Sequence, residues 1–364
     1  MAKRDAKGKR GKLLTLDDYE RAAKAKLSKM AWDYFRSGAD RERALARNLR
    51  AYERLVIWYR VLVDVTEREL STTVLGTPVR APILVAPTAY HRLAHPEGEL
   101  ATARGAAQAG TIYVASTLAT TRLEDVAEAS DAPKWFQVYV HKDRAFTQSL
   151  VERAEAAGYD ALVVTVDTPM LGRRLRDERN GFALPEGLSM SNLVPPGEGE
   201  AQGSMLASYV AERHDASFSF RDLEWLRRLS HLPLVIKGVV RADDARRALD
   251  HGAAAILVSN HGGRQLDASP ATLEALPGVV EAVGNDAEVY VDGGIRSGED
   301  VFKALALGAR AVLVGRPSLW GLAVGGAEGV ADVLRILSEE LSRTMALAGA
   351  PSVQGIDRSM VAPG

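Results

Sequence analysis

Short apolar runs alternate with helical stretches along most of the chain. Four of these runs come directly after a helical stretch that ends in glycine, and they read TIYVAS, YDALVVTVD, AAAILVSN and ARAVLVGR. Glycine commonly provides the left-handed residue that ends a helix. A run that is apolar at nearly every position is typical of a strand buried on both faces of a parallel sheet. The pattern predicts eight strands, at 83–86, 112–116, 135–140, 161–166, 234–237, 255–259, 289–292 and 311–314.

Helical stretches fill most of the gaps between these strands, at 98–109, 122–129, 143–157, 221–230, 242–250, 270–283 and 298–306. Eight alternating strand–helix units predict an α/β fold, a (β/α)8 TIM barrel. A doubly wound sheet is the alternative. It normally opens with a glycine-rich dinucleotide turn after its first strand, and the motif G-x-G-x-x-G does not occur in the sequence.

Helices are also expected on both sides of the barrel. Thr15 and Asp18 have the spacing of a helix N-cap, which predicts a helix through about residue 26, and a second helix is expected over 28–37. Apolar residues at helical spacing predict a closing helix over 327–349. We expect the first two helices to plug or flank the barrel and the last one to close the ring.

Two segments have a composition unlike the rest. The insert 177–220 follows the carboxyl end of the fourth strand and is rich in Pro, Gly, Ser and Glu. It is expected to form a mobile lid, and a disordered decoration is the alternative. The first twelve residues carry six basic side chains against Asp5, so 1–14 is expected to be a disordered basic tail rather than a nucleic-acid-binding arm. Residues 15–364 are then predicted to form a single barrel domain.

Composition narrows the class of protein. The chain has 364 residues, 46% hydrophobic residues, a net charge of −1 and no cysteine. Without cysteine there is no disulfide framework or thiolate metal site. No stretch approaches the roughly 18 apolar residues of a membrane helix, no secretory signal is apparent, and the near-neutral charge gives no footprint for nucleic acid. These features predict a cytoplasmic enzyme that acts on a small molecule.

The barrel predicts where the chemistry lies, because the carboxyl ends of its strands share one mouth. The candidate residues at these ends, most of them polar, are Thr88, Ala89, Ser116, Gln137, Tyr139, Thr165, Arg174, Lys237, His261, Arg264, Asp292, Arg296, Gly315 and Arg316. Two segments, DGGIRSG and VGRP, follow strands seven and eight, where barrels commonly bind phosphate. We therefore expect Gly293, Gly294 and Gly315 to bring backbone close to a phosphate group, and Arg296 and Arg316 to neutralise it.

The remaining candidates indicate acid–base chemistry. His261 shares the predicted mouth with Asp292, and a histidine that faces a carboxylate is suited to act as a general base. Arg264 and Arg174 have the fork geometry to clamp a substrate carboxylate, although Arg173 competes with Arg174 for the inward position. Lys237 ends the fifth strand and should face an anion, with a Schiff-base lysine as the alternative. No histidine has metal-ligand spacing, so no metal is predicted.

The motifs resemble those of a known family. The chain from about residue 14 to 360 is similar to the FMN-dependent α-hydroxy acid oxidases and dehydrogenases, which include glycolate, lactate and hydroxymandelate oxidases. The matching motifs include WDYFRSGA, WFQVYVHKDR, TVDTPMLGRRLRDERNGF, VIKGV, SNHGGRQLD and DGGIRSG. The last two together are highly specific for this family.

The resemblance implies a role for each matching residue. His261 is implied to take the substrate hydroxyl proton, with Asp292 as its orienting carboxylate. Arg174, Arg264 and Tyr34 are implied to clamp the carboxylate, and Tyr139 to contact the substrate oxygen. FMN is the implied cofactor, with Lys237 at the flavin N1–C2 edge. The implied contacts to the flavin ring and ribityl chain are Pro87, Thr88, Ala89, Ser116, Gln137, Thr165 and Ser259. The implied phosphate site consists of Gly294, Arg296, Gly315 and Arg316, in agreement with the expectation above.

The implied reaction converts an (S)-2-hydroxy acid into a 2-oxo acid, with hydride transfer to flavin N5 and reoxidation by O2 to give H2O2. The alternative for the electron acceptor is a soluble dehydrogenase that passes electrons to a quinone or a carrier protein. The alternative from another functional class is a non-catalytic barrel that binds flavin or phosphate. Glycolate oxidase has tryptophan at the position of Leu118, so a medium, bulky or aromatic 2-hydroxy acid, or lactate, is expected. The resemblance also implies a homotetramer.

Overall fold

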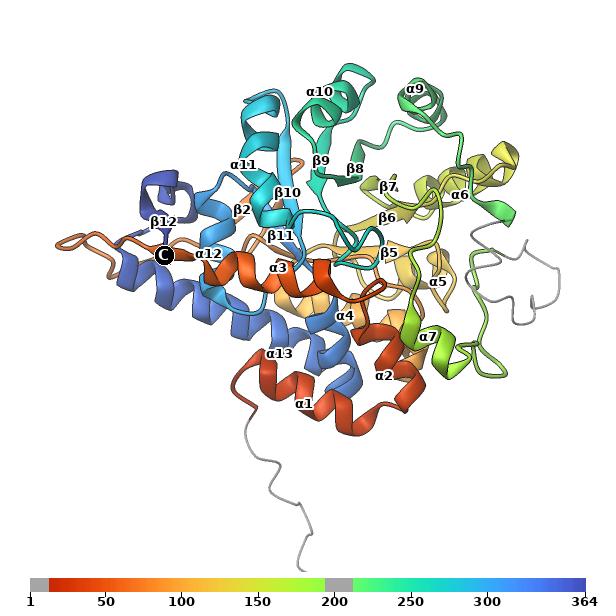
Figure 1. Cartoon of the computed structure of the whole chain (residues 1–364), viewed down its shortest axis with the longest axis horizontal. Helices are drawn as coiled ribbons and strands as arrows, with labels where there is room; N and C mark the ends of the chain where they lie inside the picture. Colours follow the sequence, from red (N-terminus) through yellow and green to blue (C-terminus); the bar gives the residue numbers. More distant parts are fainter. Residues whose placement is uncertain (1–12, 194–211) are drawn as a thin grey trace, which may run out of the picture.

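The computed structural model describes residues 13–193 and 212–364 of the chain. Its centre is a closed barrel of eight parallel strands (Figure 1), in the order β10-β11-β4-β5-β6-β7-β8-β9. The strands are β4 (Ile83–Val85), β5 (Tyr113–Ser116), β6 (Lys134–Val138), β7 (Ala161–Thr165), β8 (Leu234–Val239), β9 (Ala255–Val258), β10 (Glu288–Asp292) and β11 (Ala311–Val314). The predicted (β/α)8 barrel is confirmed, and each predicted strand is present to within a few residues.

Helices surround the barrel on its outside (Figure 1). They are α4 (Gly98–Ala109), α5 (Leu123–Glu128), α6 (Arg144–Ala156), α7 (Leu175–Asn180), α9 (Phe220–Leu229), α10 (Ala242–Asp250), α11 (Thr272–Val283), α12 (Gly298–Ala306) and α13 (Arg316–Ala348). The strands are buried at almost every position, as their continuous apolar sequences require. A cluster of inward-facing apolar side chains fills the lower barrel, and Val74 and Val79 of the hairpin β2 (Thr72–Val74) and β3 (Thr77–Val79) close its floor.

The N-terminal helices match the sequence pattern in part. The helix α1 (Leu16–Lys26) begins with the predicted capping box, in which Thr15 and Asp18 satisfy each other's backbone N–H groups. Next come α2 (Lys29–Arg36) and α3 (Arg43–Glu53), and the sequence analysis did not predict α3. The strand β1 (Leu55–Ile57) then pairs antiparallel with β12 (Val361–Pro363), so the segment before the barrel is tied to the end of the chain.

The closing helix is longer than expected. The predicted helix over 327–349 corresponds to the second part of α13, which begins at Arg316 directly after β11. A kink at Gly326, whose φ of 61° lies in the left-handed region, separates the two parts. The glycine-rich sequence WGLAVGGAEG concealed the first part, because glycine disfavours helix interiors. The second part packs beside α1 and α4.

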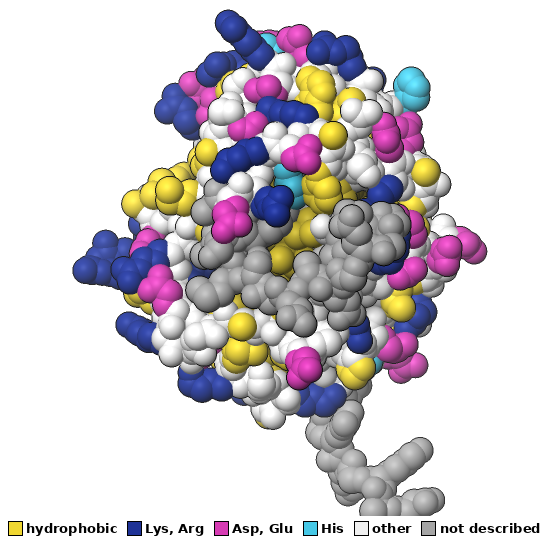
Figure 2. All heavy atoms as spheres, turned by 90° about the vertical axis from the view of Figure 1, so that its right-hand side faces the viewer, with side chains coloured by type: hydrophobic (Ala, Val, Ile, Leu, Met, Phe, Trp, Pro, Cys, Tyr) yellow, Lys and Arg dark blue, Asp and Glu magenta, His cyan; other side chains and the backbone are white. Residues whose placement is uncertain are grey.

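The two segments of unusual composition are described in part. The first residues of the 177–220 insert belong to α7 rather than to a loop. The central part of the insert and all but the last two residues of the 1–14 tail lie outside the described residues, so the lid and the disordered tail stay predictions. The described part of the face shown in Figure 2 carries basic and acidic side chains interspersed with one another, in keeping with the balanced composition.

Candidate active site

The carboxyl ends of the barrel strands surround a cavity of about 1080 Å³, open solvent at its mouth included. Every residue proposed for the site from the sequence lines it, with the exception of Ser259: Tyr34, Pro87, Thr88, Ala89, Ser116, Leu118, Gln137, Tyr139, Thr165, Arg174, Lys237, His261, Arg264, Asp292, Gly294, Arg296, Gly315 and Arg316. Ser259 is fully buried behind this wall, where its hydroxyl accepts a hydrogen bond from the backbone N–H of His261 (3.1 Å).

The histidine of the site pairs with a carboxylate that the sequence analysis missed. Nδ1 of His261 lies 2.8 Å from Oδ1 of Asp167. The expectation that Asp292 orients His261 is therefore wrong. Because a carboxylate only accepts, the Nδ1 proton is donated to Asp167, and Nε2 is left as the acceptor. His261 itself has a φ of 58°, a left-handed conformation that is uncommon for residues with a side chain and often occurs at functional sites.

Depth in the barrel explains why Asp167 is the partner. Asp292 is the last residue of β10, whereas Asp167 and His261 both lie beyond the ends of β7 and β9. The two residues that extend past their strands therefore meet above the strand ends. Lys237, on the intervening strand β8, lies below them. The signal for Asp167 was present in the motif TVDTP, where a carboxylate follows a buried strand.

Electrostatics keep this pair in the form that a base requires. Burial lowers the pKa of His261 to about 4, although the charge of Asp167 opposes the shift. Burial would raise the pKa of Asp167, but His261 and Lys237 beside it outweigh that effect and lower the pKa to about 2. At neutral pH the imidazole is thus neutral and its partner is ionised. This combination can take up a proton and stabilise the resulting imidazolium.

Lys237 faces two carboxylates, as its position predicted. Its Nζ lies 3.9 Å from Oδ2 of Asp167 and 3.8 Å from Oδ2 of Asp292, and the side chain is 4% exposed. Burial raises the pKa of Asp292, and Lys237 opposes that shift. These contacts favour the anion-facing lysine over the Schiff-base alternative. The second carboxylate oxygen of Asp292, Oδ1, is buried without a hydrogen-bond partner among the described residues.

Two arginines converge on one aromatic ring at the mouth. The guanidinium carbons of Arg264 and Arg174 lie 4.9 and 5.9 Å from the centre of the Tyr34 ring. Arg173 instead points outward and pairs with Glu178, which resolves the choice between the neighbouring arginines. Burial and the charge of Arg174 lower the pKa of Arg264 to about 10. Two like charges that are buried together favour binding of an anion.

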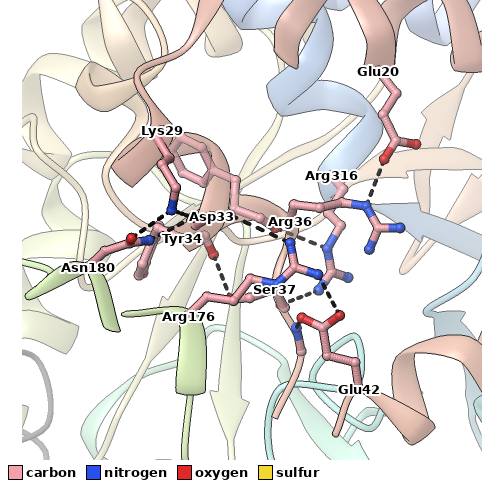
Figure 3. A network of polar contacts seen from close by, with 12 residues as sticks. Glu20, Lys29, Asp33, Tyr34, Arg36, Ser37, Glu42, Arg176, Asn180 and Arg316 are labelled. Carbon is pink, nitrogen blue, oxygen red and sulfur yellow. Dashed lines mark hydrogen bonds and ion pairs between the residues drawn. The ribbon is translucent and has the colours of Figure 1, made fainter. Parts of the chain in front are cut away.

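A second cationic region adjoins the first, because Arg264 and Arg316 both donate to the carbonyl oxygen of Ser37 at 2.9 Å. Arg316 donates hydrogen bonds to the carbonyl oxygens of Phe35, Gly262 and Ser37 at 2.9–3.0 Å, and Figure 3 shows its contact with Ser37. Arg296 lies over the Trp320 ring at 4.8 Å, and burial lowers its pKa to about 10. Gly315 precedes the first residue of α13, so the positive end of that helix dipole faces the same region.

Unsatisfied polar atoms line the middle of the cavity. The Ser116 hydroxyl donates to Oε1 of Gln137 (3.1 Å), which leaves Nε2 of Gln137 as a buried donor without a partner among the described residues. The Thr165 hydroxyl and two nitrogens of Arg174 are in the same state. Buried polar groups are rarely left unpaired, so these atoms indicate a polar ligand in the cavity.

The chain matches the model of the FMN-dependent dehydrogenase family over residues 23–363. It belongs to that family. It is 53% identical to the L-lactate oxidase of Nostoc sp. over 359 residues, which cover 96% of this chain and 98% of the relative. It is 51% identical to human 2-hydroxyacid oxidase 1, with 96% of each chain covered, and 48% identical to the glycolate oxidase of Spinacia oleracea, again with 96% of each chain covered.

The fold agrees with solved structures of the family. A crystal structure of mandelate oxidase superposes with a TM-score of 0.91 at 44% identity and covers 97% of this chain and 99% of that chain. A variant of mandelate oxidase in complex with (S)-mandelic acid superposes with a TM-score of 0.89 at 43% identity, with the same coverage. The resemblance inferred from the motifs is thereby confirmed, and FMN is the cofactor of the family.

The residues present fit FMN as this enzyme's cofactor. Arg296, Arg316 and the start of α13 provide a phosphate site, and the Lys237 cation and the unsatisfied amide of Gln137 line the same cavity. Within the described residues, 13–193 and 212–364, no group of three or more His, Asp or Glu side chains could hold a metal ion. Over the same residues, no helix has both the length and the apolar character to cross a bilayer.

Proposed function

We propose that this member of the FMN-dependent dehydrogenase family oxidises an (S)-2-hydroxy acid to the 2-oxo acid and is reoxidised by O2. The observation that carries the proposal is the juxtaposition, in one cavity, of a neutral histidine paired with a carboxylate and a two-arginine clamp. The three relatives described above are named as oxidases of lactate, 2-hydroxy acids and glycolate. A barrel that only bound flavin would have no need of the base.

Each half of the substrate has a matching set of side chains. We assign the substrate carboxylate to Arg174 and Arg264, whose guanidinium groups bind a carboxylate through paired hydrogen bonds. Nε2 of His261 accepts the proton of the 2-hydroxyl group, and the charge of Asp167 stabilises the imidazolium that results. Burial raises the pKa of Tyr139, so its hydroxyl stays protonated and serves as a donor to the substrate oxygen.

The cofactor is assigned to the rest of the cavity. When bound, FMN would supply the acceptor for the α-hydrogen of the substrate. Lys237 would provide a cation at the flavin ring, and Arg296 and Arg316 would hold the phosphate. Asp292, freed from the role at His261, keeps its place among the cofactor contacts, because its unpaired Oδ1 is available there. Pro87, Thr88 and Ala89 form the opposite wall.

The substrate is proposed to be lactate or a larger 2-hydroxy acid. Leu118 is buried in the cavity wall and occupies the place where glycolate oxidase carries a tryptophan, so the pocket has more room. The relative named L-lactate oxidase, at 53% identity, is in keeping with this proposal. The cytoplasmic location stays a prediction from the sequence.

A homo-oligomer, by resemblance a tetramer, is also proposed. Large apolar side chains gather on the exposed segment 56–63, where Trp58 is 65% and Leu62 fully exposed. Exposed apolar patches of this kind commonly mark protein–protein contacts. Light scattering coupled to size-exclusion chromatography measures the number of subunits.

One experiment tests the reaction and the acceptor together. FMN-loaded enzyme is mixed anaerobically with glycolate, lactate, mandelate and 2-hydroxyoctanoate while the flavin absorbance is followed, and air is then admitted. Bleaching followed by recovery of colour and formation of peroxide is expected. Flavin that stays reduced in air would favour the alternative, a dehydrogenase that uses a quinone or carrier protein. The variant His261→Ala should retain FMN but bleach at least 100-fold more slowly; normal bleaching would contradict the role of the base.

A further inference from the structure

The helix that carries Tyr34 is fastened to the helix that follows Arg174 by a buried carboxylate (Figure 3). Asp33 of α2 is 8% exposed. Its Oδ2 accepts hydrogen bonds from Nζ of Lys29 at 2.7 Å and from Nδ2 of Asn180 at 2.6 Å, and its Oδ1 lies 3.5 Å from Nη1 of Arg176. Asn180 and Arg176 both belong to α7. We call these four residues, together with Glu42, the α2–α7 clasp.

The clasp holds both ends of α2. The other nitrogen of Arg176, Nη2, donates to Oε2 of Glu42 at 2.8 Å, and Oε1 of Glu42 accepts from the backbone N–H of Gly38 at 3.2 Å. Lys29 also donates to Oδ1 of Asn180 at 2.8 Å. One helical turn of α7 is thus attached to the beginning of α2, to its middle and to the turn that follows it. Removal of these partners would leave the buried charge of Asp33 unpaired, which costs free energy.

The carboxylate clamp lies directly beside these contacts. Tyr34 follows Asp33 in α2, and Arg174 immediately precedes the first residue of α7. The Tyr34 ring also stacks on Phe182, just after α7, with the ring centres 4.4 Å apart. The separation of Tyr34 from Arg174, 5.9 Å between ring centre and guanidinium carbon, is therefore fixed by how α2 sits against α7.

The charge of Asp33 is maintained by its partners. Burial would raise the pKa of Asp33, but the hydrogen bonds from Lys29 and Asn180 and the charge of Arg176 outweigh it and lower the pKa below its ordinary value. The carboxylate is ionised at neutral pH, and its contacts are charge-assisted. Such contacts are stiffer than neutral ones and suit a positioning role.

We propose that Asp33 is a positioning residue for substrate binding, which holds Tyr34 and Arg174 in register through Asn180 and Arg176. This inference rests on the proposed function, because it concerns the same carboxylate clamp. Asp33 contacts neither substrate nor cofactor in this assignment. Its loss should therefore weaken binding of the carboxylate more than binding of the phosphate, because the hydrogen bonds of Arg316 go to carbonyl oxygens at the C-terminal end of α2 and not to Asp33.

The test compares Asp33→Ala, Asp33→Asn and Asn180→Ala with the wild type as FMN-loaded enzymes. The first readout is the Kd of a non-reacting carboxylate, the 2-oxo acid product, measured from the perturbation of flavin absorbance. We expect this Kd and the KM to rise about tenfold in Asp33→Ala, kcat to change less than threefold, and the Kd for FMN to change less than twofold. The effects of Asp33→Ala and Asn180→Ala should not add in the double variant, because each single variant already breaks the same Asp33–Asn180 hydrogen bond.

Glu124→Ala is the matched control. Glu124 of α5 makes a half-buried ion pair with Arg153 of α6 at 2.7 Å, away from the clamp. This variant should lower the melting temperature but keep the Kd of the carboxylate. Should Asp33→Ala not fold, Asp33→Asn and Asn180→Ala make the same comparison with smaller changes in shape.

Three outcomes overturn the inference. A carboxylate Kd within twofold of wild type in all three variants removes the positioning role, and so does an equal loss of FMN and carboxylate binding, which would indicate general loosening. If the wild type neither bleaches with any 2-hydroxy acid nor binds a 2-oxo acid, the proposed function fails, and the role of Asp33 fails with it. A wild type that binds the 2-oxo acid while the variants bind it equally well overturns the clasp alone.

Discussion

Replacing Asp167 by asparagine tests the central correction that the structure makes. The 2.8 Å contact between Asp167 and His261 puts the two charge centres about 4 Å apart once the imidazole is protonated. At an effective dielectric constant of about 20, their attraction is about 4 kcal/mol. That energy corresponds to about 10³-fold in rate. Because asparagine keeps a hydrogen-bond acceptor but no charge, we expect the rate of proton removal to fall by about 10² to 10³-fold.

Asp292→Asn is the comparison variant. This carboxylate is also buried beside Lys237, but the Nδ1 proton of His261 goes to Asp167 instead, so neutralising Asp292 should alter cofactor binding more than proton removal. The assay is anaerobic stopped-flow measurement of flavin reduction at saturating substrate. The FMN content of each variant is measured first, because both carboxylates face Lys237.

The pH profile gives a second readout for the same variant. His261 must be neutral to act as a base, so activity should fall as the pH falls through its pKa of about 4. The charge of Asp167 raises that pKa, so Asp167→Asn should move the acid limb to lower pH. A loss below tenfold in Asp167→Asn, combined with a larger loss in Asp292→Asn, would refute the pairing seen here and restore Asp292 as the orienting group.

Two further predictions concern the pocket and the stability of the fold. Leu118→Trp should lower kcat/KM for mandelate at least tenfold while leaving that for glycolate within threefold, because Leu118 lines the cavity; equal effects on both acids would show that this position does not control size. Burial lowers the pKa of His141 and of His214 to about 4. Between pH 4 and 6.5 the unfolded chain therefore binds more protons than the folded chain. The free energy of unfolding should decrease as the pH falls through that window, by up to about 3 kcal/mol per histidine. Thermal unfolding between pH 4.5 and 7 measures the slope, which His141→Gln should flatten; an unchanged slope would contradict the assignment.

The sequence was most informative about the barrel. Each strand was found because it is apolar at consecutive positions and bounded by turn residues, a pattern that a parallel barrel imposes on all eight. The helix α3 was not predicted because its sequence, RALARNLRAYE, is highly charged and has no capping signal. Its N-cap position is occupied by Glu42 in a left-handed conformation. The first part of α13 was not predicted because of its glycines. In both places the tertiary packing overrides a weak local preference.

The predicted site residues, Ser259 excepted, line one cavity, but the pairing of His261 differs from the predicted one. The rule that strand ends share a mouth placed Lys237, His261 and Asp292 together without any knowledge of distances. It does not say how far above the strand end each side chain lies, and the choice between Asp292 and Asp167 depends on that depth. Adjacent strands favour Asp292, because β9 and β10 are neighbours, whereas Asp167 follows a strand two places away.

The backbone of the SNHGGRQLD loop directs His261 to Asp167 rather than to Asp292. His261, Gly262 and Gly263 all have positive φ, at 58°, 63° and 75°, so the chain turns sharply where it leaves β9. A side chain at Gly263 would collide with the backbone of Leu45 in α3, with a contact of 2.5 Å. The packing of the N-terminal helices against this loop thus helps to determine where the imidazole lies. Helices before the barrel therefore shape both halves of the site: α2 supplies Tyr34 to the carboxylate clamp, and α3 confines the loop that brings the base above Lys237 to Asp167.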